Sequence, residues 1–369
     1  MQRRGNGQPA SILPARTPGR RRGWLRPGVL AAALLAGVVH LAGACGGHEG
    51  EGRAPAERVL RVAVPPDGLL APPVFRMEET QPLAAEGLVI EVAAWRGPQQ
   101  LRALVASGSV DFAGLHVPTA ALFAERDLDV RFLGASLGNV LHVVTDDPEA
   151  AVLEDLRGRT VAVPMRGEFP DIMFRAALEE SGLTGSVEIR YVATALDAAN
   201  LVASGSARAA VVAEPHVSIL LEKQERHGAA DRRLYASVDI QAAWARARGE
   251  DAPMPTAGLA AIGPVARQDD VLRQFWSAYA GAVAWCLANP GEAATLHGAA
   301  ERDEAALRGA ARAFSACARV PVPSLHERAR MEDFLDVMGA QAPDTFGGLR
   351  PGDDFYWDPV EAGGTDARP

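Results

Sequence analysis

The hexapeptide Leu-Val-Ala-Ser-Gly-Ser occurs twice in this chain, at 104–109 and again at 201–206. The residues after the two copies align without a gap, so that Pro118 falls on Pro215. Internal self-similarity at a fixed period indicates one structural unit built twice. The hexapeptide therefore predicts two similar units in tandem.

A second pair of matching segments lies upstream of the hexapeptides. The pattern V-A-V-P-x-x-G occurs within 61–68 and again within 160–167. The alternative is that a chain rich in Ala and Val produces such matches by accident. Because the landmarks recur in the same order, we favour two repeats of about a hundred residues each.

Within each repeat, short apolar strands alternate with amphipathic helices. In the first repeat we expect strands at 59–65, 88–95 and 110–115, and helices near 73–85 and 98–108. The same order recurs in the second repeat. Such alternation implies mostly parallel sheets with helices on both faces, so two repeats imply two α/β lobes. Beyond two further strands at 234–240 and 257–263, the rest is predicted to be helical and to pack back on the first lobe.

The N-terminus has the character of an export signal. Residues 1–28 carry seven arginines and no acidic residue, and an apolar run follows over 28–44. This order of basic, apolar and small residues is typical of a secretory signal. Leu41–Cys45 resembles a lipobox, which predicts lipid modification at Cys45, while 21–26 resembles a twin-arginine signal. An uncleaved anchor helix is the alternative; either way the remainder is expected outside the cytoplasm.

The charge of the remaining chain is strongly negative. The formal charge is −9, and without residues 1–45 it is −16, because that segment holds seven of the 37 basic residues and none of the 46 acidic ones. An acidic surface argues against nucleic acid or an anionic membrane as a partner. Cys286 and Cys317 lie in apolar helical contexts; whether they form a disulfide or stay free thiols is left open by the sequence.

In open α/β sheets, ligands bind at the carboxyl ends of the strands, so each repeat is expected to aim its loops at one shared cleft. The loops after V-A-V-P and after the later strand of each repeat are the candidates: 66–68 and 115–119 in the first, 165–170 and 213–216 in the second. Helix N-termini there offer unpaired N–H groups to an anionic or polar group. The candidate ligand-binding residues are Asp67, Trp95, His116, Thr119, Arg166, Glu168, Glu214 and His216.

Each candidate has a structural alternative. Trp95 stacks on a ligand or belongs to the core. Arg166 clamps an oxyanion or is solvated. Glu168, like the nearby Asp171, accepts from a ligand or complements a helix dipole, which we favour.

The remaining candidates have alternatives too. Glu214 contacts a ligand or caps a helix. His116 and His216 lack further residues at metal-ligand spacing, so no metal or cofactor is expected. Asp67 is at the same time a simple Asp-Gly turn residue.

No nucleophile elbow, P-loop or zinc-protease motif occurs, so no catalytic residues are predicted. The motifs that do occur resemble a known family of binding proteins. These motifs are the export signal with its Cys, D-L-R-G-R-T-V-A-V-P at 155–164, A-E-P at 213–215, L-A-N-P-G-E-A-A-T-L at 287–296 and G-D-D-F-Y-W-D-P at 352–359. Their order over 58–359 resembles the solute-binding proteins of nitrate/sulfonate/taurine ABC importers, including the thiamine-precursor-binding type.

The resemblance implies a two-lobed, type II periplasmic binding fold with two mixed or parallel sheets flanked by helices. It also implies a central cleft that closes on its ligand, and a two-strand hinge near Val143–Asp146 and Leu234–Asp239. The predicted parts are an export segment at 1–45, a tether at 46–57, a first lobe at 58–145 plus 236–359, a second lobe at 146–235 and a frayed tail at 360–369.

The implied function is that of a monomeric, lipid-anchored periplasmic protein that delivers a small organic solute to an ABC permease and its ATPase. Arg166 suits a sulfonate, nitrate-like or carboxylate group, whereas Glu214 and Trp95 suit a flat heterocycle such as a pyrimidine. The alternatives are a solute sensor for a signalling receptor and an enzyme of the same fold that acts on a cofactor precursor.

Overall fold

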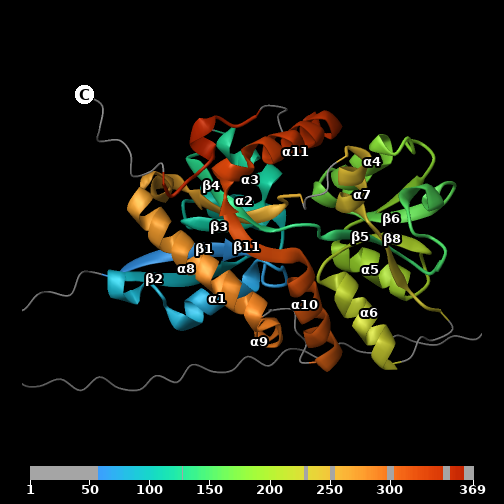
Figure 1. The fold of residues 1–369 in the computed structure, drawn as a ribbon, viewed down its shortest axis with the longest axis horizontal. Coiled ribbons are helices and arrows are strands. Elements are labelled where there is room, and N and C mark those ends of the chain that lie inside the picture. The colour runs from blue at the N-terminus through green and yellow to red at the C-terminus, as the bar shows by residue number, and fades with distance from the viewer. Residues whose placement is uncertain are drawn as a thin grey trace, which may run out of the picture. The chain divides into compact units, whose positions relative to one another are not determined.

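Two β-sheets, each covered by helices, organise the chain (Figure 1). The computed structural model describes residues 57–126, 128–227, 232–249, 254–296, 303–343 and 350–360. The predicted export segment with Cys45, and most of the predicted tether and tail, lie outside these ranges. No helix within them is long and apolar enough to cross a membrane.

The first sheet has six strands in the order β11-β4-β10-β3-β1-β2. Their bounds are β1 Arg58–Val64, β2 Leu88–Ala94, β3 Phe112–His116, β4 Val130–Leu137, β10 Ala257–Ile262 and β11 Ala318–Pro323. The second sheet has five strands in the order β7-β6-β8-β5-β9. Their bounds are β5 Leu141–Thr145, β6 Thr160–Pro164, β7 Glu188–Val192, β8 Ala209–Ala213 and β9 Tyr235–Asp239.

The two sheets repeat one topology. In the first, β2, β1 and β3 are parallel neighbours, and β10 and then β4 follow as antiparallel neighbours. In the second, β7, β6 and β8 are parallel neighbours, and β5 and then β9 follow as antiparallel neighbours. The predicted pair of α/β lobes built to one plan is confirmed.

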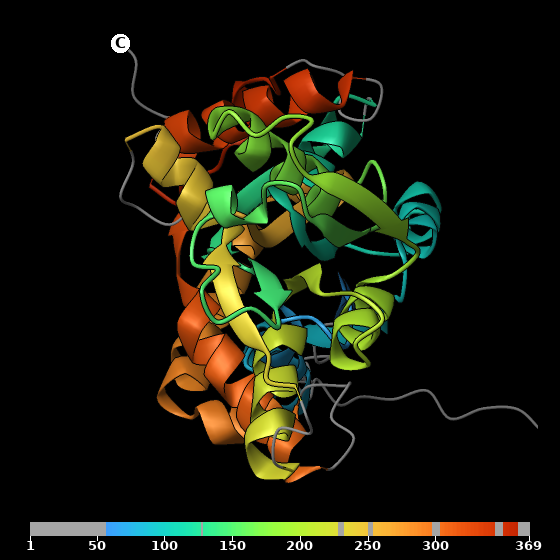
Figure 2. The same cartoon turned by 90° about the vertical axis from the view of Figure 1, so that its right-hand side faces the viewer.

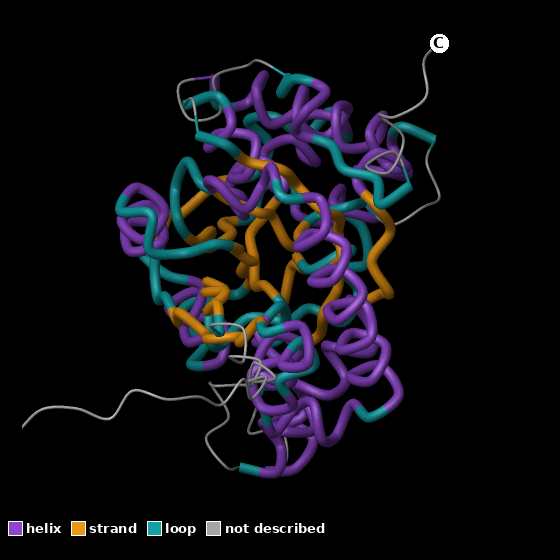
Figure 3. Tube along the Cα trace, turned by 90° about the vertical axis from the view of Figure 1, so that its left-hand side faces the viewer, coloured by secondary structure: helices purple, strands orange, loops and turns teal. Residues whose placement is uncertain are grey.

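Helices lie outside the sheets, as Figure 3 shows. On the second sheet, α4 and α7 cover one face and α5 and α6 the other, which Figure 2 shows from the side of that sheet. The helices that follow the first three strands are α1 Ala71–Thr80, α2 Pro98–Ala106 and α3 Val117–Ala124. The second-sheet helices are α4 Phe169–Glu180, α5 Ala195–Ala203, α6 His216–His227 and α7 Ile240–Ala247. The late helices are α8 Asp269–Ala288, α9 Pro290–Thr295, α10 Glu304–Cys317 and α11 Arg328–Gln341.

The repeated hexapeptide ends a helix and turns the chain toward the next strand. In the first copy Gly108 has φ 64° and the Ser109 N–H donates to Leu104 O at 3.1 Å. In the second copy Gly205 has φ 78°. Glycine adopts this left-handed conformation without steric cost, which explains why it stands at the C-terminus of both α2 and α5.

Alanine substitutions at two glycines are expected to have opposite effects on stability. Gly108→Ala forces a side chain into the left-handed region and should lower the free energy of unfolding by about 1 kcal/mol. Gly281→Ala, within α8 where no atom lies within 4 Å of the added Cβ, should raise it by up to about 1 kcal/mol. Urea unfolding measures both changes, and equal changes of one sign would contradict this account of the hexapeptide turn.

The structure differs from the sequence predictions in three places. β5 and β9 both belong to the second sheet, so the chain changes sheet at 138–140 and between Asp239 and Ala257, rather than at 145/146 and 235/236. β11 is a strand in a region where only helices were predicted. It was not predicted because Pro321 and Pro323 argue against a strand; both prolines are tolerated because β11 lies at the edge of the sheet. The tail does not pack only on the first lobe, because α10 lies along α6.

Buried side chains hold the first passage between the sheets. Gln241, fully buried at the start of α7, accepts hydrogen bonds from the N–H groups of Val140 at 2.5 Å and Leu141 at 2.9 Å. Its amide donates to the hydroxyl of Thr256 at 2.5 Å, just before β10. One side chain therefore joins both stretches of chain that connect the two sheets.

Candidate functional site

A cavity of about 280 Å³ lies between the two sheets, where the predicted loops meet. Its lining includes residues of all four loops that the repeats were expected to contribute. The first repeat contributes Pro65 and Gly68 from one loop and Leu115, His116 and Thr119 from the other. The second repeat contributes Met165, Glu168, Phe169 and Pro170 from one loop and Ala213 and Glu214 from the other. Leu70, Leu101, Leu137, Val140 and Leu141 make most of the remaining wall apolar.

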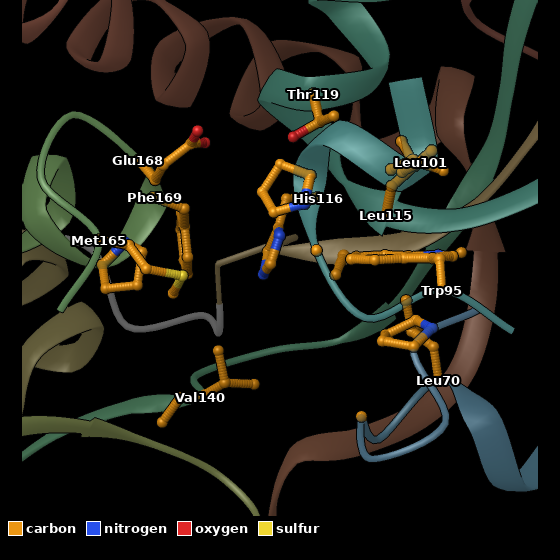
Figure 4. A pocket seen from close by; sticks show the side chains of 18 of the residues that line it. Leu70, Trp95, Leu101, Leu115, His116, Thr119, Val140, Met165, Glu168 and Phe169 are labelled. Carbon is orange, nitrogen blue, oxygen red and sulfur yellow. The ribbon is translucent and has the colours of Figure 1, made fainter. Parts of the chain in front are cut away.

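His116, at the end of β3, stands in the middle of the cavity (Figure 4). Its ring stacks on Phe169 of α4, with ring centroids 4.4 Å apart and planes 25° apart. Trp95, just after β2, lies on the other side of the imidazole in this view. His116 and Trp95 come from the first lobe and Phe169 from the second, so the aromatic groups around the cavity join both lobes.

Burial lowers the pKa of His116 from 6.5 to about 4. The imidazole is therefore neutral near pH 7, with one nitrogen that donates and one that accepts. Neither ring nitrogen forms a hydrogen bond with another described residue. The indole N–H of Trp95 is buried and likewise has no acceptor in the described part of the chain. His116 thus offers one donor and one acceptor to a bound molecule, whereas the Trp95 N–H is not accessible from the cavity.

The depressed pKa of His116 predicts a pH dependence of stability. The unfolded chain binds a proton at this side chain near pH 6.5, whereas the folded protein binds it only near pH 4. Stability is therefore present above pH 6.5 and is lost progressively as the pH falls from 6.5 to 4. With saturating solute to hold the lobes closed, we expect unfolding experiments to show this loss in the wild-type protein and a smaller one in His116→Gln, and NMR to show a neutral ring at pH 5. A ring that titrates near pH 6.5 would contradict this burial.

One ion pair crosses the cavity wall. Arg102 of α2 lies 3.4 Å from Glu168, which immediately precedes α4. The other arginine of the lining, Arg96, is exposed and forms no ion pair within the described ranges. The lining holds two arginines, Arg96 and Arg102, and two glutamates, Glu168 and Glu214, so the cavity has no net formal charge with which to attract an anion.

Five of the eight candidate residues line the cavity: Trp95, His116, Thr119, Glu168 and Glu214. The Glu214 carboxylate also accepts hydrogen bonds from the N–H of Ser218 at 3.0 Å and its hydroxyl at 2.9 Å. Glu214 therefore accepts hydrogen bonds from the first turn of α6, which is the capping role given above as the alternative to ligand binding. The roles of these five residues in binding stay predictions.

The other three candidates lie outside the lining. The guanidinium of Arg166 lies 5.0 Å from the ring centroid of Tyr191. Burial lowers the pKa of His216, while the carboxylates of Asp67 and Glu214 oppose that shift. Asp67 itself is exposed. The geometry does not bring these three side chains together with the cavity.

Asp171 shapes the loop before α4 from inside the protein. It is 1 % exposed and accepts from the Gly167 N–H at 2.8 Å, the Tyr191 hydroxyl at 3.0 Å and Arg175 at 3.2 Å. These bonds fix a turn in which Met165 has φ 54° and Gly167 φ 78°. The turn directs Met165 and Phe169 toward the cavity and Arg166 away from it.

Sequence reasoning missed several lining residues. Phe169 and Met165 belong to a loop that was predicted to line the cleft, but neither was singled out. Arg102 pairs with a residue 66 positions away, and nothing in its helical surroundings indicates that contact. Cys286 and Cys317 are buried free thiols, which settles the question that the sequence left open. Among the described residues, no group of three or more His, Cys, Asp or Glu side chains is placed to hold a metal ion.

Solved structures that share this fold include an ABC transporter and two sulfonate-binding proteins. An ABC transporter structure from Parabacteroides distasonis has a TM-score of 0.67 at 19% identity and covers 81% of this chain and 99% of its own. The periplasmic aliphatic sulphonate binding protein SsuA from Escherichia coli has a TM-score of 0.60 at 14% identity, covering 82% and 92%. The alkanesulfonate-binding protein SsuA from Xanthomonas axonopodis pv. citri, bound to MOPS, has a TM-score of 0.57 at 15% identity, covering 78% and 94%.

No curated protein sequence matches the chain. The family described as NMT1/THI5 like matches residues 83–228. This range begins between α1 and β2 and ends just after α6. These residues supply most of the cavity lining from both lobes. Residues 83–228 are thus similar to the NMT1/THI5-like family, and the chain has the two-lobed fold of the periplasmic binding proteins that its sequence resembles.

Proposed function

We propose that this protein is the extracytoplasmic solute-binding component of an ABC importer and that it closes around a small planar organic solute. The observation that carries the proposal is the stack of His116 on Phe169 across the cavity between the lobes. A solute that touches both lobes at once binds the closed form more tightly than the open one. Such a difference in affinity is what shifts a protein from open to closed.

The chemistry of the lining favours an uncharged, flat solute over an anion. His116 is neutral near pH 7, and the lining arginines, Arg96 and Arg102, are matched in number by Glu168 and Glu214. Flat aromatic walls from Trp95, His116 and Phe169 suit a ring, and the imidazole nitrogens of His116 suit its polar edge. A pyrimidine-type heterocycle fits this description better than a sulfonate or nitrate.

A thermal-shift screen tests the proposed function. We expect neutral nitrogen heterocycles to raise the melting temperature of the purified protein by several degrees, because a ligand at a hundred times its dissociation constant adds about 2.7 kcal/mol. Sulfonates, nitrate and carboxylates should have no effect. Trp95→Leu should abolish the shift, and Trp285→Leu, on α8 outside the cavity, should retain it. A shift by sulfonates alone would contradict the solute class, and silence across all classes would contradict solute binding.

We also propose that the protein is anchored through a lipid on Cys45, as its lipobox-like sequence predicts. Cys45→Ser should move the protein from the membrane fraction to the soluble fraction of cells. Mass spectrometry of the wild-type N-terminus should show an acylated Cys45. An unmodified Cys45 on a chain that keeps residues 1–44 would instead support the anchor-helix alternative.

A further inference from the structure

Helix α10 belongs to the first lobe by its neighbours in sequence, but it packs against both lobes, on α9 and most extensively on α6. It follows α8 and α9, which pack against α1 of the first lobe, and it leads directly into β11 of the first sheet. In space, however, α10 lies along α6, which covers the second sheet (Figures 1 and 2). The helix therefore connects elements of the first lobe, contacts α9 of that lobe, and has its most extensive contact with α6 of the second lobe.

The contact between α10 and α6 is close at one glycine. A Cβ added to Gly309 would lie 2.4 Å from the Ile219 Cα and 2.8 Å from the Ser218 carbonyl carbon. Only glycine lets the two backbones approach so closely. The buried face of α10 is otherwise mostly alanine, at Ala305, Ala306, Ala310 and Ala313. Backbones packed at this distance do not slide past each other without separating.

Three ion pairs set the register of the two helices. Arg312 pairs with Glu222 at 3.6 Å, Lys223 with Asp303 at 3.8 Å, and Arg226 with Glu304. Exposed pairs of this kind contribute little to stability. These pairs instead fix how the two helices are aligned, because each joins a residue of α6 to a residue of α10 or to its N-cap, Asp303.

The C-terminus of α10 meets the first passage between the sheets. The Gly138 N–H, immediately after β4, donates to the Cys317 carbonyl at 2.9 Å. The next residue, Ala318, already pairs with Leu137 in the first sheet. The chain thus leaves a helix attached to the second lobe and enters the first sheet within one peptide bond.

We propose that α10 moves with the second lobe and that Cys317–Ala318 is a third hinge between the lobes, beside the two connections already described. Gly309 is then a positioning residue, because it packs against Ser218, whose N–H and hydroxyl hold Glu214 in the cavity wall. The α10–α6 unit carries this wall toward the first lobe as one body. The proposal deepens the proposed function by naming what moves in closure, and it does not depend on which solute binds.

Spin-label distances in the unliganded protein test this assignment. Labels are placed at exposed positions on α6, α10 and α8 with Glu225→Cys, Ser315→Cys and Ser277→Cys, in pairs and in a Cys45→Ser background. We expect a narrow distribution for 225–315, and a broad one for both 277–315 and 225–277. A narrow 277–315 with a broad 225–315 would overturn the proposal, because α10 would then move with the first lobe. Three narrow distributions would overturn it too, because no hinge would be operating.

A glycine variant adds a second measurement. Gly309→Ala should shift the 225–315 distances to longer values, since the added Cβ must push α10 away from the α6 backbone. Gly281→Ala, in α8 with open space around the added Cβ, should leave them unchanged. An unchanged 225–315 distance in Gly309→Ala would contradict the close packing. If Gly309→Ala does not fold, the three label pairs still decide the proposal, and solute binding is tested separately by the thermal-shift screen.

Discussion

Phe169→Ala is expected to weaken solute binding about 100-fold, a loss of about 2.8 kcal/mol at 1.4 kcal/mol per tenfold change. Phe169 lines the cavity and is the residue of the second lobe on which His116 stacks. Removing the ring takes away both the apolar face offered to the solute and the contact that joins the lobes once they close. Isothermal calorimetry with the solute from the thermal-shift screen measures this loss.

Two further variants separate binding from damage to α4. Phe169→Leu keeps apolar volume but not the flat face, so its affinity should lie between those of the wild type and Phe169→Ala. Phe174→Leu changes an aromatic residue of the same helix that is fully buried outside the lining. It should lower stability but leave the affinity within about twofold, since distant sites act independently. An unchanged affinity in Phe169→Ala would show that the solute does not bind in this cavity.

Gln241→Met is expected to lower the free energy of unfolding by about 3 to 5 kcal/mol. The substitution keeps the length of the side chain but leaves the N–H groups of Val140 and Leu141 without their acceptor and the Thr256 hydroxyl without its donor. Each buried polar group left unpaired costs about 1 to 3 kcal/mol. Urea unfolding with an unchanged slope would assign the loss to the folded state.

A glutamine on the surface provides the control for this prediction. Gln99→Met, at an exposed position of α2, should change the free energy of unfolding by less than about 0.5 kcal/mol. If Gln241→Met lowers the free energy of unfolding by less than about 1 kcal/mol, water or a rearranged backbone must supply the hydrogen bonds that the N–H groups of Val140 and Leu141 lose. In that case Gln241 would not be the side chain that fixes this passage.

The repeat predicted more of the fold than any single motif did. Matching hexapeptides and matching V-A-V-P strands placed β1, β3, β6 and β8 correctly, because the same turn chemistry and the same strand spacing recur in both lobes. The sheet partners of β5 and β9 were not readable, since both are short apolar strands next to a change of lobe. β11 was missed because two prolines in six residues argue against a strand unless its place at a sheet edge is known.

The position of the cavity could be predicted from the order of strands and helices, but its chemistry depends on the directions in which the side chains point. Trp95 and His116 were predicted because they stand at strand ends, where parallel sheets expose their loops. Arg166 stands in a lining loop too, yet the turn fixed by Asp171 directs it onto Tyr191. A sequence does not show such a turn, because Tyr191 lies 20 residues from Asp171 and carries no local signal of the contact.

Small-angle scattering with and without the solute tests closure most directly. The structure brings the lobes into contact through His116 with Phe169 and through Arg102 with Glu168. The account predicts that the unliganded protein has a larger radius of gyration and that saturating solute contracts it to the value of this structure. An equal radius of gyration with and without saturating solute would contradict closure of two lobes around a bound solute.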